Sequence, residues 1–363
     1  MARSLVRLGA LFAFLFLIWI ISYTFEPRKT AYSCRTFWYC IGVSDRHGYA
    51  HPLPSTLSLE SEVTLRDGTV RYRRATQDAN PELLFLALIQ GWQSWSSDFR
   101  STQRTANDFM DLLASTKLDL TKAALAIMTA SADEYERTMK ATARLPFART
   151  DVYLREDEDL GVKYEDRHDP RVQLARRANL ALLRNYLMLR GLQDEQHIIW
   201  LDADVVELSE NIIQTMISHS ESNRDVGIIT AICHQNEMAN YDKNAWKIGD
   251  TPELLRPVAD GDRDSASAEL VATRLMLPEL INGTDDSALV AIDSVGGTLL
   301  YVRAELVRKG VSFPPFNIVG TSWSQAGWIG VETEGICYIA KALRSGGCYV
   351  LGGKHHVRHI DWG

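Results

Sequence analysis

Four continuous apolar runs are the strongest pattern along the chain. They are LLFLALI at residues 83–89, AALAIMTA at 123–130, HIIWL at 197–201 and VGIITAI at 226–232. A short run without polar alternation is typical of a strand that is buried on both faces of a sheet. The segment TDVYLRE at 150–156 predicts a fifth strand of the same kind.

Polar and amphipathic segments separate these runs. They predict helices near residues 98–115, 132–144, 169–190 and 209–219. Alternation of strands and helices predicts an α/β fold with a mostly parallel central sheet and helices on both faces. Ligands of such sheets bind at the carboxyl ends of the strands, so residues that follow a strand are candidates for chemistry.

The N-terminus carries an uncharged apolar segment, residues 8–25, which follows Arg3 and Arg7. As a helix it would be roughly 27 Å long, enough to cross a thin bilayer. The alternative is a cleaved signal peptide, but the run is long for one and no clear cleavage site follows. We therefore expect a retained transmembrane signal anchor, a short cytoplasmic tail at residues 1–7 and a lumenal body, which is a type II topology.

The remaining chain divides into a predicted lumenal stem at residues 26–80 and a predicted catalytic domain at residues 81–363. A hairpin around Asp67-Gly68 is expected within the stem. Residues 250–290 are expected to form a polar insertion or loop. They contain a glycosylation sequon at Asn282, which has meaning only in a lumenal protein.

Net charge and cysteine content exclude two classes of function. The net charge of −7, without a long basic run, argues against nucleic acid as a partner. None of the five cysteines forms a CxxC pair, which argues against a zinc cluster. So sparse a set fits either a reducing compartment or a lumen with one or two disulfides.

Asp202 and Asp204 follow the apolar run 197–201 directly. Carboxylates at a strand end can bind Mn²⁺ or Mg²⁺, which prefers oxygen ligands and can in turn bind a diphosphate. The alternative is that Asp204 or Ser209 caps the next helix. Because the acids lie at the ligand edge of the predicted sheet, we favour the metal site.

Four further groups of residues each allow two interpretations. Arg177 and Arg184 share a helix face that either is solvated or contacts a phosphate. Gly296 and Gly297 follow Asp293 and allow either close backbone approach to a ligand or a tight turn. The other two groups lie nearer the C-terminus.

Glu332 and Glu334 open an amphipathic helix, where they either stabilise the helix dipole or act on an acceptor hydroxyl. Three histidines, His355, His356 and His359, lie near the chain end. They either form a polar tail or supply a metal ligand. Of the three, His359 is favoured because apolar Ile360 and Trp362 follow it.

Six motifs occur in the same order in a known family. They are RHDPRVQLARRANLALLRNYLM, WLDADVVE, NYDKNAW, IDSVGGTLLYVRAELVRKGVSFPPF, ETEG and RHIDW, and they cover the chain from Arg167 onward. In these stretches the chain resembles the fungal mannan polymerase subunits of the Golgi, which are glycosyltransferase family 62.

The resemblance implies a GT-A-type nucleotide-sugar-binding fold and retaining, α-1,6 transfer of mannose from GDP-mannose to a mannan or N-glycan acceptor. It implies Mn²⁺ at Asp202 and Asp204, with His359 as the distal ligand, and association with related subunits. Other motif positions are implied to shape the donor or acceptor sites: Arg184, Asn185, Asp242, Asn244, Trp246, Asp293, Glu332 and Glu334. A non-catalytic scaffold subunit of such a complex is the alternative.

Overall fold

The computed structural model describes residues 58–77, 79–96, 103–156, 170–249, 257–322 and 324–360. All lie in one compact unit, Ser55–Gly363. The tail predicted at 1–7, the signal anchor predicted at 8–25 and the stem up to residue 57 fall outside the described residues. Within the described ranges, no helix is both long and apolar enough to cross a membrane.

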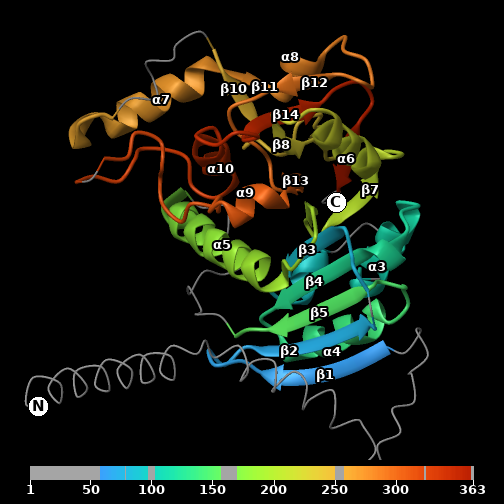
Figure 1. The fold of residues 1–363 in the computed structure, drawn as a ribbon. Coiled ribbons are helices and arrows are strands. Elements are labelled where there is room, and N and C mark those ends of the chain that lie inside the picture. Colours follow the sequence, from blue (N-terminus) through green and yellow to red (C-terminus); the bar gives the residue numbers. More distant parts are fainter. Residues whose placement is uncertain are drawn as a thin grey trace, which may run out of the picture. The chain divides into compact units, whose positions relative to one another are not determined.

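Ten strands of the described residues form one sheet (Figure 1). Their order across the sheet is β1 (Ser58–Thr64), β2 (Val70–Thr76), β5 (Arg149–Leu154), β4 (Ala123–Thr129), β3 (Leu83–Ile89), β6 (His197–Leu201), β13 (Leu299–Arg303), β8 (Val226–Thr230), β14 (Gly347–Leu351) and β12 (Leu289–Ala291). β2, β12 and β13 run against the other strands. The α/β class is confirmed, and the predicted apolar runs form β3, β4, β6 and β8.

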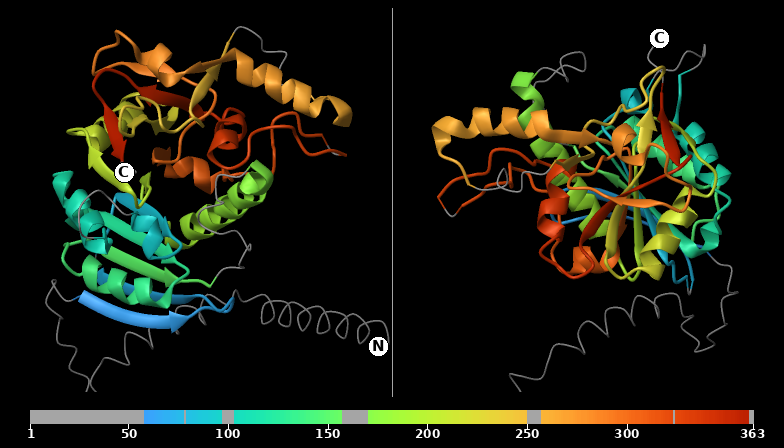
Figure 2. Two further views of the ribbon diagram at one scale, coloured as in Figure 1. Left: turned by 180° about the vertical axis from the view of Figure 1, so that it is seen from behind. Right: turned by 90° about the horizontal axis from the view of Figure 1, so that it is seen from above.

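Helices cover both faces of the sheet, which explains why its central strands are apolar throughout. α3 (Ala106–Ser115), α4 (Ala132–Thr142) and α6 (Ile212–Ser222) contribute to one apolar cluster, and α5 (Pro170–Gly191), α9 (Ala304–Arg308) and α10 (Thr333–Ala340) to the other. Within β3, Phe85 packs in the cluster of Phe109, whereas its neighbour Leu84 packs in the cluster of Leu187. Seen from above, α5 lies on the opposite side of the sheet from α3 and α4 (Figure 2).

The hairpin predicted at Asp67-Gly68 is present, but it belongs to the main sheet. β1 pairs with β2, and β2 pairs in turn with β5, from Val70↔Leu154 to Ala75↔Arg149. The predicted stem boundary at residue 80 is therefore wrong for residues 58–77. The physical reason is that β2 completes the backbone hydrogen bonds of β5, which would otherwise be an open edge.

The predicted polar loop at 250–290 contains regular structure in its described part. Its elements are η5 (Asp260–Asp262), α7 (Arg263–Thr273), β11 (Arg274–Met276) and α8 (Leu277–Ile281). β11 pairs with β10 (Trp246–Ile248), and Leu270 of α7 packs in an apolar cluster with Trp246. The sequence does not predict α7, because Leu270 is its one buried residue. A single buried position gives no repeating apolar pattern at helical spacing.

A small second sheet lies beside the carboxyl end of β6. It consists of β7 (Val205–Leu208), β15 (His356–His359) and β9 (Ile232–His234), with β15 antiparallel to β7 and parallel to β9. Two short 3-10 helices, η1 (Trp92–Trp95) and η2 (Leu120–Lys122), complete the elements near the central strands. Through this second sheet, the C-terminal strand reaches the segment that follows Asp202 and Asp204.

Candidate functional site

Asp202 and Asp204 lie in the tight connection between β6 and β7. The Asp202 N–H donates to the Thr298 carbonyl at 3.0 Å, and the Val205 N–H donates to the Asp202 carbonyl at 3.3 Å. The helix-cap interpretation of these acids is wrong, because a strand follows Asp204. The next helix, α6, has Asn211 at its N-cap, and Ser209 Oγ instead accepts the His356 N–H at 3.0 Å.

Arg184 of α5 links the first aspartate to a buried glutamate. Its Nη2 donates to Asp202 Oδ1 at 3.0 Å, and its Nε lies 2.9 Å from Glu332 Oε1. The guanidinium also lies 5.0 Å from the ring centroid of Trp200 and 5.6 Å from that of Phe313. Arg184 is therefore a buried part of the acid site, and the interpretation as a solvated basic face is wrong for it.

The carboxyl of Asp202 is electrostatically crowded. Enclosure by protein raises its pKa above the ordinary value, the Arg184 charge opposes this, and the charges of Asp204, Asp242 and Glu332 raise the pKa further. Several acids thus converge on a place with one facing arginine. Such a place favours an additional cation.

His359 reaches the second aspartate from β15. Its Nε2 lies 2.9 Å from Asp204 Oδ2, and its ring centroid lies 4.3 Å from that of Tyr241. Burial alone would lower the pKa of His359, but the hydrogen bond and charge of Asp204 outweigh it and raise the pKa overall. The structure therefore brings together a carboxylate and an imidazole that are 155 positions apart in the chain.

The fit of a divalent metal to this site is partial. Across the described ranges, no group of three His, Cys, Asp or Glu side chains is arranged to hold a metal ion. The donor chemistry does suit Mn²⁺ or Mg²⁺, since two carboxylates lie two residues apart and a buried imidazole touches one of them. A bound ion would have to replace the Asp204–His359 contact.

Asp242 explains the two glycines of the IDSVGG motif. Its Oδ2 accepts the Gly297 N–H at 2.8 Å and the Thr298 hydroxyl at 3.1 Å. A Cβ atom on Gly296 would lie 2.3 Å from Asp242 Oδ2, and one on Gly297 would lie 2.8 Å from Arg184 Nη2. The glycines thus permit close approach to protein side chains of the site. Contact with a ligand remains a prediction for both.

Arg177 and Glu334 meet in an ion-pair cluster. Glu334 Oε2 lies 3.2 Å from Arg177 Nη1, its Oε1 contacts Arg274, and the Arg177 Nη2 also donates to the Val331 carbonyl at 2.8 Å. Glu334 is thereby held by two arginines. Its predicted catalytic role and the predicted phosphate contact of Arg177 stay predictions.

Glu332 has an unusual backbone. Its φ is +61° and ψ is −132°, a conformation that costs a non-glycine residue of order 1–3 kcal/mol and recurs at functional sites. Its side chain is buried, close to Arg184 and within 3.0 Å of the Thr333 hydroxyl. Glu332 is therefore a partner of Arg184. Its catalytic role remains a prediction.

Asn185 fixes a loop on the same side of the sheet. Its Nδ2 donates to the Phe313 carbonyl at 2.7 Å, and its Oδ1 accepts the Phe313 N–H at 2.8 Å. Both ends of the amide are therefore engaged with backbone. Binding of a substrate by Asn185 remains a prediction.

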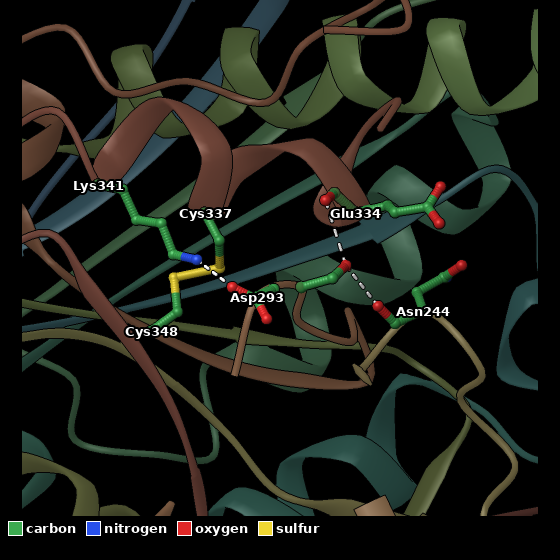
Figure 3. Close-up of a disulfide and its surroundings, with 7 residues drawn as sticks. Asn244, Asp293, Glu334, Cys337, Lys341 and Cys348 are labelled. Carbon is green, nitrogen blue, oxygen red and sulfur yellow. Dashed lines mark hydrogen bonds and ion pairs between the residues drawn. A yellow bond between two sulfur atoms is a disulfide. The ribbon is translucent and has the colours of Figure 1, made fainter. Parts of the chain in front are cut away.

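In the part of the chain that the structure describes, the predicted residues Asn244, Trp246 and Asp293 form no hydrogen bond or ion pair with Asp202 or Asp204, although the Asn244 N–H donates to Asp242 Oδ1 at 3.1 Å. Ser294 Oγ donates to the carbonyls of Asn244, at 2.6 Å, and of Glu334, at 3.1 Å. Asp293 pairs with Lys341 beside the Cys337–Cys348 disulfide (Figure 3) and accepts the Ile248 N–H at 2.8 Å. Trp246 is buried, with the Arg274 guanidinium 4.3 Å from its ring centroid.

The remaining predicted positions lie at the surface or in other contacts. Asn282 is exposed, as a glycosylation acceptor must be. His355 lies next to the Asp286 carbonyl, at 3.1 Å, and His356 lies next to the Lys354 carbonyl, at 2.8 Å. Of the three C-terminal histidines, His359 therefore contacts the aspartate pair.

Sequence reasoning missed three features of the site: Arg104, Arg274 and the disulfide. Arg104 is buried against the carbonyls of Ala203 and Val205. Nothing in the local sequence marks it, since it stands alone before a helix. The disulfide joins α10 to β14 across 11 positions, a pairing that spacing alone could not select.

A family model described as Anp1 matches residues 75–317, more than half of the chain. The chain belongs to the Anp1 family. The predicted resemblance to fungal mannan polymerase subunits is thereby confirmed, and curated relatives carry such names.

Three relatives illustrate this. The mannan polymerase complex subunit mnn9 of Schizosaccharomyces pombe is 32% identical over 200 residues, which is 53% of this chain and 55% of the relative. The subunit MNN9 of Candida albicans is 30% identical over 224 residues, 58% of each chain. The mannan polymerase I complex VAN1 subunit of Saccharomyces cerevisiae is 27% identical, over 59% of this chain and 39% of the relative. The Anp1-family chain thus spans a little over half the length of the first two.

Solved structures match this chain more distantly. The mannosyltransferase PcManGT from Pyrobaculum calidifontis, in complex with GDP-Man and Mn²⁺, is 10% identical, with 78% of this chain and 58% of that chain covered and a TM-score of 0.42. S. aureus TarS 1-349 is also 10% identical, over 77% and 60%, with a TM-score of 0.41. Similarity at this level decides neither ligand nor reaction.

Proposed function

We propose that this Anp1-family chain is a Golgi mannosyltransferase of GT-A type. It would transfer mannose from GDP-mannose, with retention and in α-1,6 linkage, to a mannan or N-glycan acceptor. The observation that carries the proposal is the contact between Asp204 and His359 next to Asp202, at the carboxyl end of β6. That edge is where ligands of α/β sheets bind.

The chain's own residues would share the work as follows. Asp202, Asp204 and His359 would hold Mn²⁺ or Mg²⁺, which when bound offsets the charge of a departing diphosphate. Arg184, 3.0 Å from Asp202, places a second positive charge at the same point and keeps Asp202 oriented. Asp242 and Glu332 orient the backbone and the arginine around them.

The proposed route to retention is a front-face one, in which the acceptor hydroxyl attacks the mannose C1 on the face from which the diphosphate leaves. The bond between C1 and the phosphate oxygen breaks, the bond between C1 and the acceptor oxygen forms, and the hydroxyl proton passes to the leaving phosphate. Glu332 and Glu334 are proposed to lie near that acceptor. Both carboxyl groups form ion pairs with arginines, and their oxygens would accept hydrogen bonds from hydroxyl groups.

A lumenal location and association with related subunits complete the proposal. The Cys337–Cys348 disulfide suits an oxidising compartment such as the secretory pathway. Exposed Asn282 within its sequon suits the same location. Residues 8–25 would anchor the chain as a single-pass type II protein, and the names of the relatives place them in multi-subunit complexes.

One observation favours the alternative, a non-catalytic scaffold subunit. Asp202 and Asp204 each already contact a cation or imidazole, so the structure itself supplies them with partners. Titration calorimetry with GDP and Mn²⁺ separates the two functions. A transferase binds GDP only together with the metal, whereas a scaffold that has lost the site binds neither.

The test of the proposed function is transfer by the purified full chain. GDP-mannose, GDP-fucose, UDP-glucose and UDP-N-acetylglucosamine are each supplied with Mn²⁺ and an α-mannoside acceptor. We expect transfer from GDP-mannose alone and its loss in the Asp202→Asn, Asp204→Asn double variant. Asp111→Asn, at an exposed position far along α3, is the matched control. Transfer that survives the double variant contradicts the proposed site.

A further inference from the structure

Arg104 is a buried guanidinium that contacts the backbone on both sides of Asp204. Only 3% of the residue is exposed. Its Nη2 donates to the Val205 carbonyl at 2.9 Å, and its Nη1 lies 3.5 Å from the Ala203 carbonyl. Because buried carbonyl groups need donors, this arginine helps to satisfy two backbone acceptors, one on each side of Asp204.

The same guanidinium connects that segment to η1 and, through it, to α4. Its Nη1 also donates to the Trp95 carbonyl at 3.3 Å. Trp95 is itself held, since its Nε1 donates to Glu134 Oε2 at 2.6 Å and its ring packs against Phe109 at 5.8 Å between centroids. Arg104 thus joins the segment after β6 to the segment after β3, at the ligand edge of neighbouring strands.

The position of Arg104 is fixed by the helix that follows it. Thr105 is the N-cap of α3 in a capping box: its Oγ1 accepts the Asn107 N–H at 3.2 Å, and its N–H donates to Asp108 Oδ2 at 2.8 Å. On the other side, Gln103 Nε2 donates to the Ser96 carbonyl at 2.7 Å. The backbone on either side of Arg104 is therefore anchored, and its side chain extends from a rigid base.

We infer that Arg104 is a positioning residue that fixes the direction of the Asp204 carboxylate toward His359. This inference rests on the proposed function, because it assigns to Arg104 the support of the proposed metal ligand. Contacts to the carbonyls before and after Asp204 restrict the dihedral angles on which its side-chain direction depends. Supporting contacts of this kind typically change metal affinity by about 10–100-fold when they are removed.

Arg104→Lys is the informative variant. Lysine keeps the positive charge and most of the length, but its single ammonium cannot serve three carbonyls in the planar arrangement of a guanidinium. Arg144→Lys, at an exposed arginine that pairs with Asp111 in the middle of α3 and donates to Asn107 Oδ1, is the matched control. Circular dichroism melting of each variant identifies a temperature at which both are folded.

Two measurements on the full chain then test the inference. The first is hydrogen–deuterium exchange in EDTA, which needs neither metal nor sugar. We expect faster exchange in the peptide 202–208 of Arg104→Lys, with exchange over β4 unchanged. Equal exchange of 202–208 in wild type and variant overturns the inference, whatever the protein's activity.

The second measurement is Mn²⁺ affinity in the presence of GDP, from the electron paramagnetic resonance signal of free Mn²⁺. We expect a dissociation constant at least tenfold higher for Arg104→Lys and unchanged for Arg144→Lys. An unchanged value for Arg104→Lys, in a wild type that binds Mn²⁺, also overturns the inference. If the wild type binds no Mn²⁺, the proposed function loses its metal site, and the exchange measurement alone decides the role of Arg104.

Discussion

The Arg184 guanidinium lies between Asp202, 3.0 Å away, and the buried Glu332, 2.9 Å away. One residue of α5 therefore connects the end of β6 to the start of α10. The side chains of Arg184 and Glu332 are only 4% and 5% exposed, so each depends on the other for its compensation. This pair is the structural centre of the candidate site.

Arg184→Met should lower the free energy of unfolding by about 3–5 kcal/mol, since it removes the arginine that faces the buried Glu332 carboxylate. Urea denaturation followed by tryptophan fluorescence measures the change. Arg144→Met, which breaks an exposed pair with Asp111, should cost no more than about 1 kcal/mol. Similar losses in the two variants would show that the buried pair contributes no more to the free energy of unfolding than the exposed pair.

Gly296→Ala should destabilise the protein by about 1–3 kcal/mol through overpacking, because its new Cβ would meet Asp242 Oδ2 at 2.3 Å. Displaced Asp242 would also release the Gly297 N–H, so transfer activity should fall together with stability. Thermal melting and the transfer assay report the two effects. Gly261→Ala is the control, as a Cβ there meets nothing within 4 Å. Wild-type activity in Gly296→Ala would contradict the role given to Asp242.

The central strands can be predicted from the sequence because a strand that is buried on both faces consists almost entirely of apolar residues. β3, β4, β6 and β8 are uninterrupted apolar runs, and each was expected at nearly its observed bounds. The position of antiparallel β13 between β6 and β8 cannot be predicted in this way, because strand order depends on contacts between segments that are distant in the chain. The sequence predicts a stem for the residues of β2 because its partner β5 lies more than 70 residues away, and nothing local indicates that pairing.

The candidate site divides in the same way. The sequence singles out Asp202 and Asp204 because they end an apolar strand, and His359 because apolar residues follow it. The structure brings His359 against Asp204, and the role of the three as metal ligands stays a prediction. The pairing of Arg177 with Glu334 was not expected, since 157 positions separate them. Arg104 was missed because its function in the fold is a contact with backbone carbonyls, which any sequence can provide.

The Cys337–Cys348 disulfide should stabilise the protein by roughly 2–4 kcal/mol, the range expected for a short closed loop. Since it anchors α10, which begins beside Glu332, the Cys337→Ala, Cys348→Ala double variant should also lose transfer activity. Urea denaturation of the two proteins measures the first effect. Alkylation in denaturant without reductant, read by peptide mass, should label Cys233 and leave Cys337 and Cys348 unlabelled. Labelling of all three would show that the disulfide is absent.

Asp67 should make acid stability depend on the hairpin turn. The hydrogen bond from the Tyr186 hydroxyl, at 2.8 Å, lowers the pKa of Asp67 to about 2, with further lowering by Thr69 and by the charge of Arg190. A carboxyl with a depressed folded-state pKa stabilises the fold above its unfolded value near 3.8, and this contribution is lost as the pH falls toward 2.

Unfolding free energies from pH 2 to 6 test this expectation. The difference between wild type and Asp67→Asn should be largest above pH 4 and should shrink toward pH 2. Asp119→Asn, at an exposed aspartate whose hydrogen bonds are local, gives the comparison for a carboxyl that does not join distant elements. A pH-independent difference for Asp67→Asn would mean that the turn is not held by this carboxylate.

The most direct measurement of the central claim is mannose transfer from GDP-mannose as a function of Mn²⁺, in wild type, His359→Gln and His356→Gln. We expect metal-dependent transfer in the wild type and in His356→Gln. For His359→Gln we expect a loss of at least tenfold and a higher Mn²⁺ requirement, because one of the proposed ligands is gone. Metal-independent transfer, or equal activity of all three proteins, would contradict a metal site at Asp202, Asp204 and His359.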